Sequence, residues 1–114
     1  MNIFSMLFAN NNIENLSPEE FKQKMDEDKK AVLIDVRTKS EFAQCRIPKA
    51  KLIDISSSSF NAEIEKLDKT RSYFVYCQSG MRSRAACSNM KKLGFEKVYN
   101  LAGGISRWNG RLDR

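Results

Sequence analysis

Short apolar runs and helically spaced apolar residues alternate along most of the chain. Residues 31–36 form a continuous apolar run with an aspartate near its end, which is typical of a central parallel strand buried on both faces. Phe60, Ile64 and Leu67 have the i, i+4, i+7 spacing of a short amphipathic helix. The whole pattern predicts strands at residues 31–36, 51–55, 73–77 and 97–99, and helices at residues 18–28, 39–42, 60–67, 82–93 and 103–108.

Capping signals mark the ends of several of these helices. Ser17, Pro18 and Glu20 stand at the N-cap, N1 and N3 positions of the first helix and predict a capping box. Gly94 follows the helix at 82–93 and predicts a left-handed C-cap. The four serines at residues 56–59 predict a loop that ends in a helix cap.

Alternation of strands and helices predicts an α/β fold, with a central, mostly parallel sheet flanked by helices on both faces. We assign residues 13–114 to this one domain and residues 1–12 to an N-terminal tail. The tail is expected to be frayed or loosely docked, although Phe4, Leu7 and Phe8 could contact a membrane or a partner. Ligands of parallel sheets bind beyond the carboxyl ends of the strands, so the residues after the strand at 73–77 are the first place to look for a site.

Composition and charge exclude several classes of function. The chain has 114 residues and a formal net charge of +6, from 20 basic and 14 acidic residues, which favours anionic partners without identifying them. The basic residues are scattered and follow no nucleic-acid-binding motif, so no nucleic-acid partner is expected. No apolar run is long enough to cross a bilayer, so stable membrane insertion is not expected.

The absence of histidine removes every Cys–His or Ser–His catalytic pair and every His-ligated metal site. The three cysteines, Cys45, Cys77 and Cys87, have no metal-ligand spacing, and the chain has no glycine-rich loop for phosphates or dinucleotides. We therefore expect neither a metal nor a cofactor. An odd number of cysteines argues against a secreted disulfide framework and favours a reducing, cytoplasmic setting.

Cys77 ends a buried strand, and the next predicted helix begins at Arg82. A tight turn between them would aim backbone N–H groups and the positive end of the helix dipole at the sulfur. Gly80 permits the curled backbone that such a turn needs. Ser79 and Ser83 can donate hydroxyl hydrogen bonds, and Arg82 adds a positive charge. Each feature favours the thiolate, so Cys77 is predicted to be a nucleophile with a depressed pKa; the alternative is a small buried residue that only packs.

Several segments resemble the signatures of rhodanese-like domains in their order and spacing. Residues 33–38, with Glu41 and Phe42, resemble the first signature, and residues 76–83 resemble the active-site loop. The closing segment of the family is similar to residues 94–95, 98–101, 103–105 and Trp108. The resemblance covers nearly all of the chain from about Ser17 onward and implies a rhodanese-like three-layer α/β domain.

The resemblance also implies an activity. Rhodanese-type sulfurtransferases move sulfane sulfur from a donor such as thiosulfate to a thiophilic acceptor, cyanide or a thiol, through a cysteine persulfide. By this resemblance Cys77 is the nucleophile, and the loop that follows it binds the persulfide and the anionic donor. The loop residues are Gln78, Ser79, Gly80, Met81, Arg82 and Ser83.

Loop length separates this activity from the phosphatase and arsenate-reductase chemistry of related folds. Those proteins use Cys-x5-Arg, whereas Arg82 stands five positions after Cys77 and gives the shorter Cys-x4-Arg loop. They also usually have histidine before the cysteine, where this chain has Tyr76. Phosphatase or arsenate-reductase activity is therefore a remote alternative, because an anion cradle must fit the charge that it stabilises.

Three charged residues after the strand at 31–36 are predicted to support the site. Asp35 and Arg37, with Glu41 as a third member, are expected to form a hydrogen-bonded or ion-paired set that shapes the loops. A direct catalytic role for them is the alternative. The turn at residues 103–105 and Trp108 are expected to pack near the rim of the site.

Residues 45–50 depart from the pattern Gly-His-Ile-x-Gly-Ala that is common in relatives. Arg46 and Lys49 could add positive charge near the mouth of the site, so the departure bears on which acceptor is preferred. Cys45 is expected to be a surface cysteine, and the alternative is a resolving thiol for a Cys77 persulfide. Cys87 is expected to be a semi-buried packing residue.

Three functional hypotheses remain. The first is an enzyme that turns over a small anionic sulfur donor and a thiol acceptor. The second is a protein-fed persulfide relay, in which the basic surface docks acidic partner proteins. The third is a noncatalytic binding module, against which the intact Cys77 argues.

Overall fold

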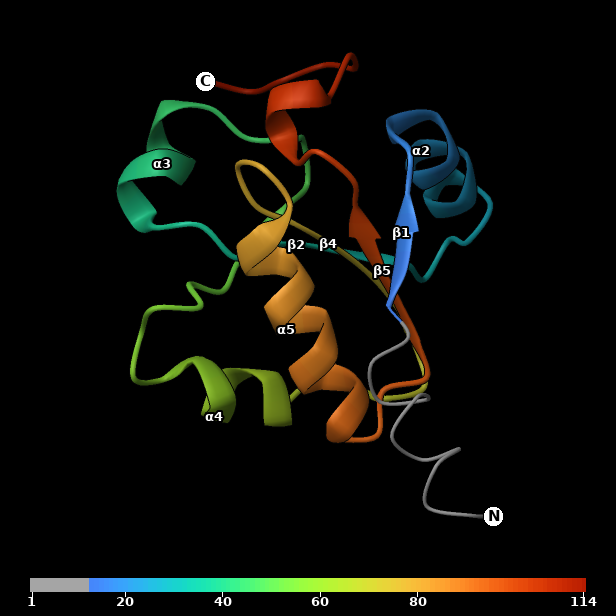
Figure 1. The fold of residues 1–114 in the computed structure, drawn as a ribbon, viewed down its shortest axis with the longest axis vertical. Helices are drawn as coiled ribbons and strands as arrows, with labels where there is room; N and C mark the ends of the chain where they lie inside the picture. The colour runs from blue at the N-terminus through green and yellow to red at the C-terminus, as the bar shows by residue number, and fades with distance from the viewer. Residues whose placement is uncertain (1–12) are drawn as a thin grey trace.

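A five-stranded, all-parallel sheet in the order β1-β5-β4-β2-β3 runs through the molecule (Figure 1). The computed structural model describes residues 13–114, and the tail predicted at residues 1–12 lies outside the described residues. The strands are β1 (Glu14–Leu16), β2 (Val32–Asp35), β3 (Lys51–Leu52), β4 (Ser72–Tyr76) and β5 (Lys97–Leu101). The helices are α2 (Pro18–Asp26), α3 (Lys39–Gln44), α4 (Phe60–Glu65), α5 (Met81–Lys92) and the 3-10 turn η1 (Ile105–Arg107).

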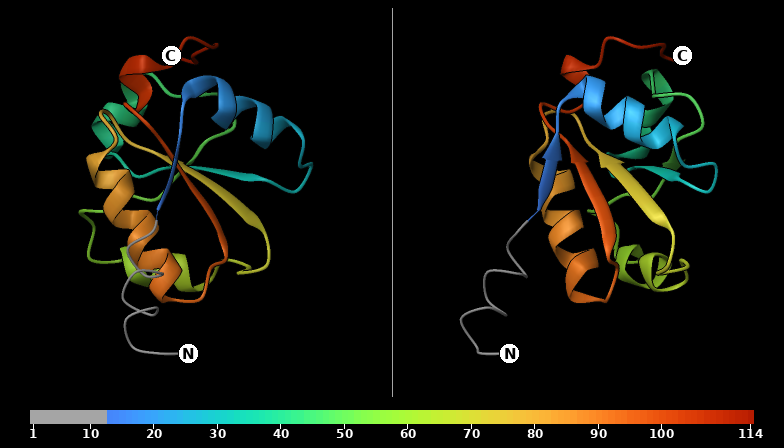
Figure 2. Two further views of the ribbon diagram at one scale, coloured as in Figure 1. Left: turned by 45° about the vertical axis from the view of Figure 1, so that its right-hand side comes forward. Right: turned by 90° about the vertical axis from the view of Figure 1, so that its right-hand side faces the viewer.

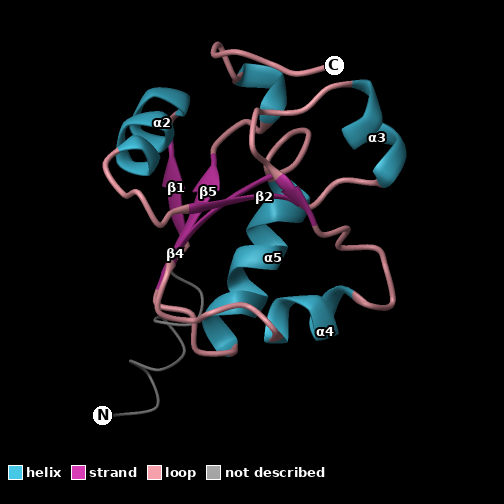
Figure 3. Cartoon of the chain, turned by 180° about the vertical axis from the view of Figure 1, so that it is seen from behind, coloured by secondary structure: helices cyan, strands magenta, loops and turns pink. Residues whose placement is uncertain are grey.

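The central strands send alternate side chains into two separate cores. On one face, Ile34 and Val75 pack with residues of α4 and α5. On the other face, Leu33 and Phe74 pack with Phe21 of α2 and with η1. In Figure 1 α5 lies in front of the sheet, and in Figure 3, seen from behind, it lies behind β2 and β4. The predicted three-layer α/β fold is confirmed, and burial on both faces explains the continuous apolar runs.

Two of the three capping signals in the sequence are present in the structure. The Ser17 hydroxyl accepts a hydrogen bond from the Glu20 N–H at 3.2 Å, and the Glu20 carboxylate accepts one from the Ser17 N–H at 3.0 Å. These bonds satisfy two N–H groups at the start of α2. Gly94 follows α5 with a φ of 101°, as the C-cap prediction requires. Ser59 stands at the N-cap of α4, but the predicted cap is wrong because its side chain makes no capping bond.

The ends of the sheet differ from the prediction. The apolar pattern does not predict β1, which pairs along its three residues with β5 at one edge. The strand predicted at residues 51–55 is only Lys51–Leu52, because Ile53 and Ile55 donate to carbonyls of Asp35 and Val36 outside a regular ladder. The helix predicted at residues 103–108 is a single 3-10 turn.

The carboxyl ends of the strands meet at one edge of the sheet, as parallel strands must. Figure 2 shows η1, in red, beside the loop from β4 to α5, with α3 on the same side of the molecule. The site sought from the sequence therefore lies among these three segments. None of the helices within residues 13–114 is long and apolar enough to span a membrane.

Candidate active site

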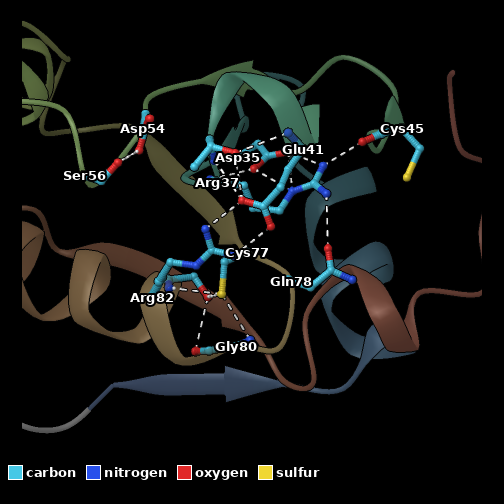
Figure 4. Close-up of polar contacts among 12 residues, drawn as sticks. Asp35, Arg37, Glu41, Cys45, Asp54, Ser56, Cys77, Gln78, Gly80 and Arg82 are labelled. Carbon is cyan, nitrogen blue, oxygen red and sulfur yellow. Dashed lines mark hydrogen bonds and ion pairs between the residues drawn. The ribbon is translucent and has the colours of Figure 1, made fainter. Parts of the chain in front are cut away.

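Cys77 is the first residue after β4, and its sulfur lies inside the turn that leads to α5. Three donors point at its Sγ: the Gly80 N–H at 3.1 Å, the Ser83 N–H at 3.3 Å and the Ser83 hydroxyl at 3.3 Å (Figure 4). Gly80 has a φ of 104°, which glycine adopts without steric cost. The turn is therefore curled around the sulfur and forms a cradle for an anion.

Burial and hydrogen bonding act in opposite directions on the Cys77 thiol. Burial is the largest effect and raises the pKa, whereas hydrogen bonds from the Ser83 side chain and from the backbone of Ser83, Gly80 and Ser79 lower it. Together the hydrogen bonds prevail, so the pKa of Cys77 lies below its usual value. Cys87 shows what burial does without such hydrogen bonds: it is fully buried on α5, and burial is the largest cause that raises its pKa to about 12. Cys87 is thus more deeply buried than the sequence suggested.

A buried arginine links three segments beside the cradle. The Arg37 Nε and Nη2 donate to Asp35 Oδ2 at 3.0 and 2.7 Å, which makes the Asp35–Arg37 pair expected from the sequence. Nη1 donates to Gln78 Oε1 at 3.3 Å, and Nη2 donates to the Cys45 carbonyl at 2.7 Å. Arg37 therefore joins the end of β2, the end of α3 and the loop after Cys77.

Glu41 belongs to a different ion pair from the one expected. Its Oε1 and Oε2 accept from Arg82 Nη1 and Nη2 at 2.8 and 2.9 Å, so the pair is bidentate (Figure 4). Glu41 Oε1 also accepts from the Thr38 N–H and closes a capping box at the start of α3. The hydrogen bond from Arg82 lowers the pKa of Glu41 to about 2. The positive charge of Arg82, which the sequence analysis expected to favour the Cys77 thiolate, is therefore balanced by the Glu41 carboxylate.

The turn before η1 holds the loop from the other side, a role that the sequence reasoning missed. The Ile105 N–H donates to the Cys77 carbonyl at 2.9 Å, and the Ser106 N–H donates to the Gln78 carbonyl at 3.2 Å. Gly104 lies so close that a Cβ atom on it would stand 2.4 Å from the Gln78 carbonyl. The Gly103–Gly104 pair is the sequence signal that could have indicated this close approach.

Asn100 of β5 is a second contact that the sequence reasoning missed. Its Nδ2 donates to the Gly80 carbonyl at 3.2 Å and to Asn15 Oδ1 at 2.8 Å. Asn100 is buried, so it fixes the loop from within the sheet. The only sequence signal is a polar residue inside an otherwise apolar strand.

The remaining predicted residues lie around this centre. Met81 is 80% exposed at the start of α5. In Figure 4 the Cys45 side chain lies on the far side of Arg37 from Cys77. Lys49, where relatives often have glycine, adopts a left-handed φ of 72°.

Within residues 13–114 no cluster of three or more histidine, cysteine, aspartate or glutamate side chains could hold a metal ion.

Comparison with known proteins bears out the resemblance to rhodanese-like domains. The family model of the rhodanese-like domain matches residues 17–111. The chain is 37% identical over 98 residues to "Putative sulfurtransferase YtwF" of Bacillus subtilis, covering 86% of this chain and 92% of that one. It is 34% identical over 101 residues to "Putative sulfur carrier protein YrkF" of the same organism, covering 89% of this chain but only 54% of that protein.

Solved structures give the same assignment. The crystal structure of a rhodanese-like domain protein from Staphylococcus aureus superimposes with a TM-score of 0.77 at 28% sequence identity. The match covers 89% of this chain and 97% of that one. Fold, sequence signatures and family model coincide over the same residues, and the chain belongs to the rhodanese-like domain family.

Proposed function

We propose that the protein is a sulfurtransferase in which Cys77 carries the transferred sulfur as a persulfide. The observation that carries the proposal is the cradle of three donors around the Cys77 Sγ. In the first half-reaction the thiolate attacks the sulfane sulfur of a donor. A sulfur–sulfur bond to Cys77 forms, and the bond between that sulfur and the rest of the donor breaks, which releases sulfite when the donor is thiosulfate.

The second half-reaction returns the enzyme to its starting state. A thiophilic acceptor, cyanide or a thiol, attacks the outer sulfur of the persulfide, and the electron pair of the breaking bond returns to Cys77. The hydrogen bonds from Gly80 and Ser83 stabilise this leaving thiolate, as they stabilise the attacking thiolate in the first step. The sulfur is transferred without a net change in oxidation state, so no redox cofactor is needed.

A protein-fed relay is the second candidate. One relative is named as a sulfur carrier protein, and the chain spans about half the length of that relative. In a relay, Cys77 receives sulfur from a protein and hands it to another, and turnover of small molecules is slow. The net charge of +6 would favour acidic partner proteins, and the free cysteines favour a reducing compartment such as the cytoplasm.

Intact-mass spectrometry after incubation with a sulfur donor tests the proposal. We expect the wild-type protein to gain one sulfur atom, which cyanide or dithiothreitol removes, and the Cys77→Ser variant to gain none. Cys45→Ser is the matched control and should gain sulfur like the wild type. The proposal is wrong if neither thiosulfate nor a small persulfide adds sulfur to the wild type, or if the Cys77→Ser variant is loaded equally.

A further inference from the structure

Arg37 and Arg82, which both lie near Cys77, are each paired with a carboxylate. Arg37 is bidentate on Asp35, and Arg82 is bidentate on Glu41. Each guanidinium faces a carboxylate in an ion pair, at 2.7 Å for Arg37–Asp35 and 2.8 Å for Arg82–Glu41, and the pKa of Glu41 is lowered to about 2. The positive charge that the sequence analysis expected Arg82 to add at the site is therefore largely cancelled by Glu41, as that of Arg37 is by Asp35.

The two pairs lie at different depths. Arg37 and Asp35 are 2% and 0% exposed, so their pair is internal. Arg82 and Glu41 are 39% and 30% exposed, and Figure 4 shows Arg82, at the start of α5, beside Cys77 and in contact with Glu41 of α3. A donor that approaches the sulfur from solvent therefore meets the Arg82–Glu41 pair and not a free arginine.

The depth of the sulfur restricts the shape of the donor. Cys77 is only 1% exposed, so the donor must reach the Sγ with a narrow end. A terminal sulfane sulfur is one atom wide in both thiosulfate and an organic persulfide. The group behind it differs: thiosulfate places a sulfonate with three oxygens at the mouth, whereas a persulfide places one sulfur with a single substituent there. A free cation at that position would favour thiosulfate more than a persulfide, since the sulfonate leaves as the sulfite dianion.

We propose that the Glu41–Arg82 pair makes the site selective for organic persulfides, R–S–SH, over thiosulfate. The inference rests on the proposed function and names its donor class. The Cys77 thiolate attacks the outer sulfur of the persulfide, the bond from that sulfur to R–S breaks, and R–S⁻ leaves and takes up the persulfide proton. Glu41 determines specificity here, because its carboxylate pairs with the Arg82 guanidinium, which would otherwise bind the sulfonate.

Capping of α3 does not account for the choice of glutamate at this position. Glutamine serves equally well at the third residue of a capping box. The chain also has a second box of the same design, Ser17 with Glu20, in which the glutamate has no arginine partner among the described residues. A substitution of Glu20 therefore serves as a control, because it removes a capping carboxylate and leaves every arginine pair intact.

The Glu41→Gln variant tests the proposal. We measure the rate at which one sulfur is loaded onto Cys77, by rapid quenching and intact-mass spectrometry, with thiosulfate and with the persulfide of N-acetylcysteine methyl ester. The readout is the ratio of the two rate constants, thiosulfate to persulfide, because a general change in the loop affects both donors alike. Freeing Arg82 should raise this ratio about tenfold, as one uncompensated charge near a partly exposed site can do.

Two further variants make the result specific. The double variant Glu41→Gln/Arg82→Gln has the same net charge as the wild type and should return the ratio to the wild-type value. Glu20→Gln should leave the ratio unchanged. The inference is overturned if Glu41→Gln leaves the ratio unchanged, if it lowers both rates in proportion, or if the double variant keeps the raised ratio. Failure of the proposed function looks different, because then neither donor loads the wild type at all.

Discussion

The Ser83 hydroxyl has one proton and two acceptors within reach. It lies 3.3 Å from the Cys77 Sγ and 3.2 Å from the Gly80 carbonyl, and it can donate to only one of them at a time. A thiolate attracts the proton more strongly than a neutral carbonyl does. The bond to sulfur is therefore expected to be strongest when the sulfur is charged, which is the state that attacks a donor.

Replacing Ser83 with alanine should raise the pKa of Cys77. Burial, which raises the pKa, remains, whereas the largest lowering contribution, the side-chain hydrogen bond, is lost. The thiolate fraction at neutral pH falls, so alkylation of Cys77 by iodoacetamide should slow about tenfold at pH 7, the usual effect of one hydrogen bond to a charged group. At high pH, where both proteins are thiolates, the rates should converge.

Ser88→Ala is the control for this measurement. Ser88 lies on α5 with Ser83 but beyond the cradle, so its removal tests the effect of a serine change in the same helix. The pH profile of alkylation should stay at its wild-type position in Ser88→Ala. An unshifted profile in Ser83→Ala would show that the hydroxyl does not stabilise the thiolate.

At the scale of elements, the loop after Cys77 is held by the short turn that contains Gly104. Gly104 has a φ of 64°, and a Cβ atom there would lie 2.4 Å from the Gln78 carbonyl and 2.6 Å from the Ser79 nitrogen. Gly94, at the end of α5, also has a positive φ, 101°, but its Cβ would meet only the Lys69 side chain, at 3.8 Å. Both glycines have a positive φ. Gly104 combines it with a ψ of −163°, a conformation nearly confined to glycine, and it is also the more crowded of the two.

Alanine at these two positions compares a positive-φ site in open space with one that is crowded by backbone atoms. Gly94→Ala should lower the free energy of unfolding by about 1 kcal/mol, the cost of a left-handed residue with a side chain. Gly104→Ala should lower it by about 3 kcal/mol, because the overlap with backbone atoms adds to that strain. It should also slow alkylation of Cys77. Urea unfolding measures both losses, and equal losses would contradict the close approach.

At the scale of the whole molecule, the sequence predicts the structural features whose physical cause lies within a few neighbouring residues. Strands buried on both faces leave continuous apolar runs, and a capping box is complete within four residues, as at Ser17. β1 has no such signal, since it is short and its place is fixed by pairing with β5. The partner of Arg82 is equally hidden: Glu41 is 41 residues away, and only the arrangement of α3 and α5 brings the two together.

The same ion pair connects the site to the stability of the whole chain. In the folded protein the pKa of Glu41 is about 2, below its usual 4.5, so the folded state binds fewer protons than the unfolded state between these values. The stabilisation is complete above about pH 5 and is lost as the pH falls towards 2. Since both side chains are about one third exposed and screened by water, we expect about 1 kcal/mol from the pair at neutral pH.

Urea unfolding of the wild type and Glu41→Gln across this pH range checks the linkage. The variant should be less stable than the wild type by about 1 kcal/mol at pH 7, and the difference should become small near pH 2, where Glu41 is protonated in the unfolded state and about half protonated in the folded state. Glu20→Gln removes a capping carboxylate that has no such arginine contact, so its difference from the wild type should depend less on pH. A Glu41→Gln difference that stays constant from pH 7 to about 2 would mean that the carboxylate acts only as a cap for α3 and that its charge does not stabilise the fold.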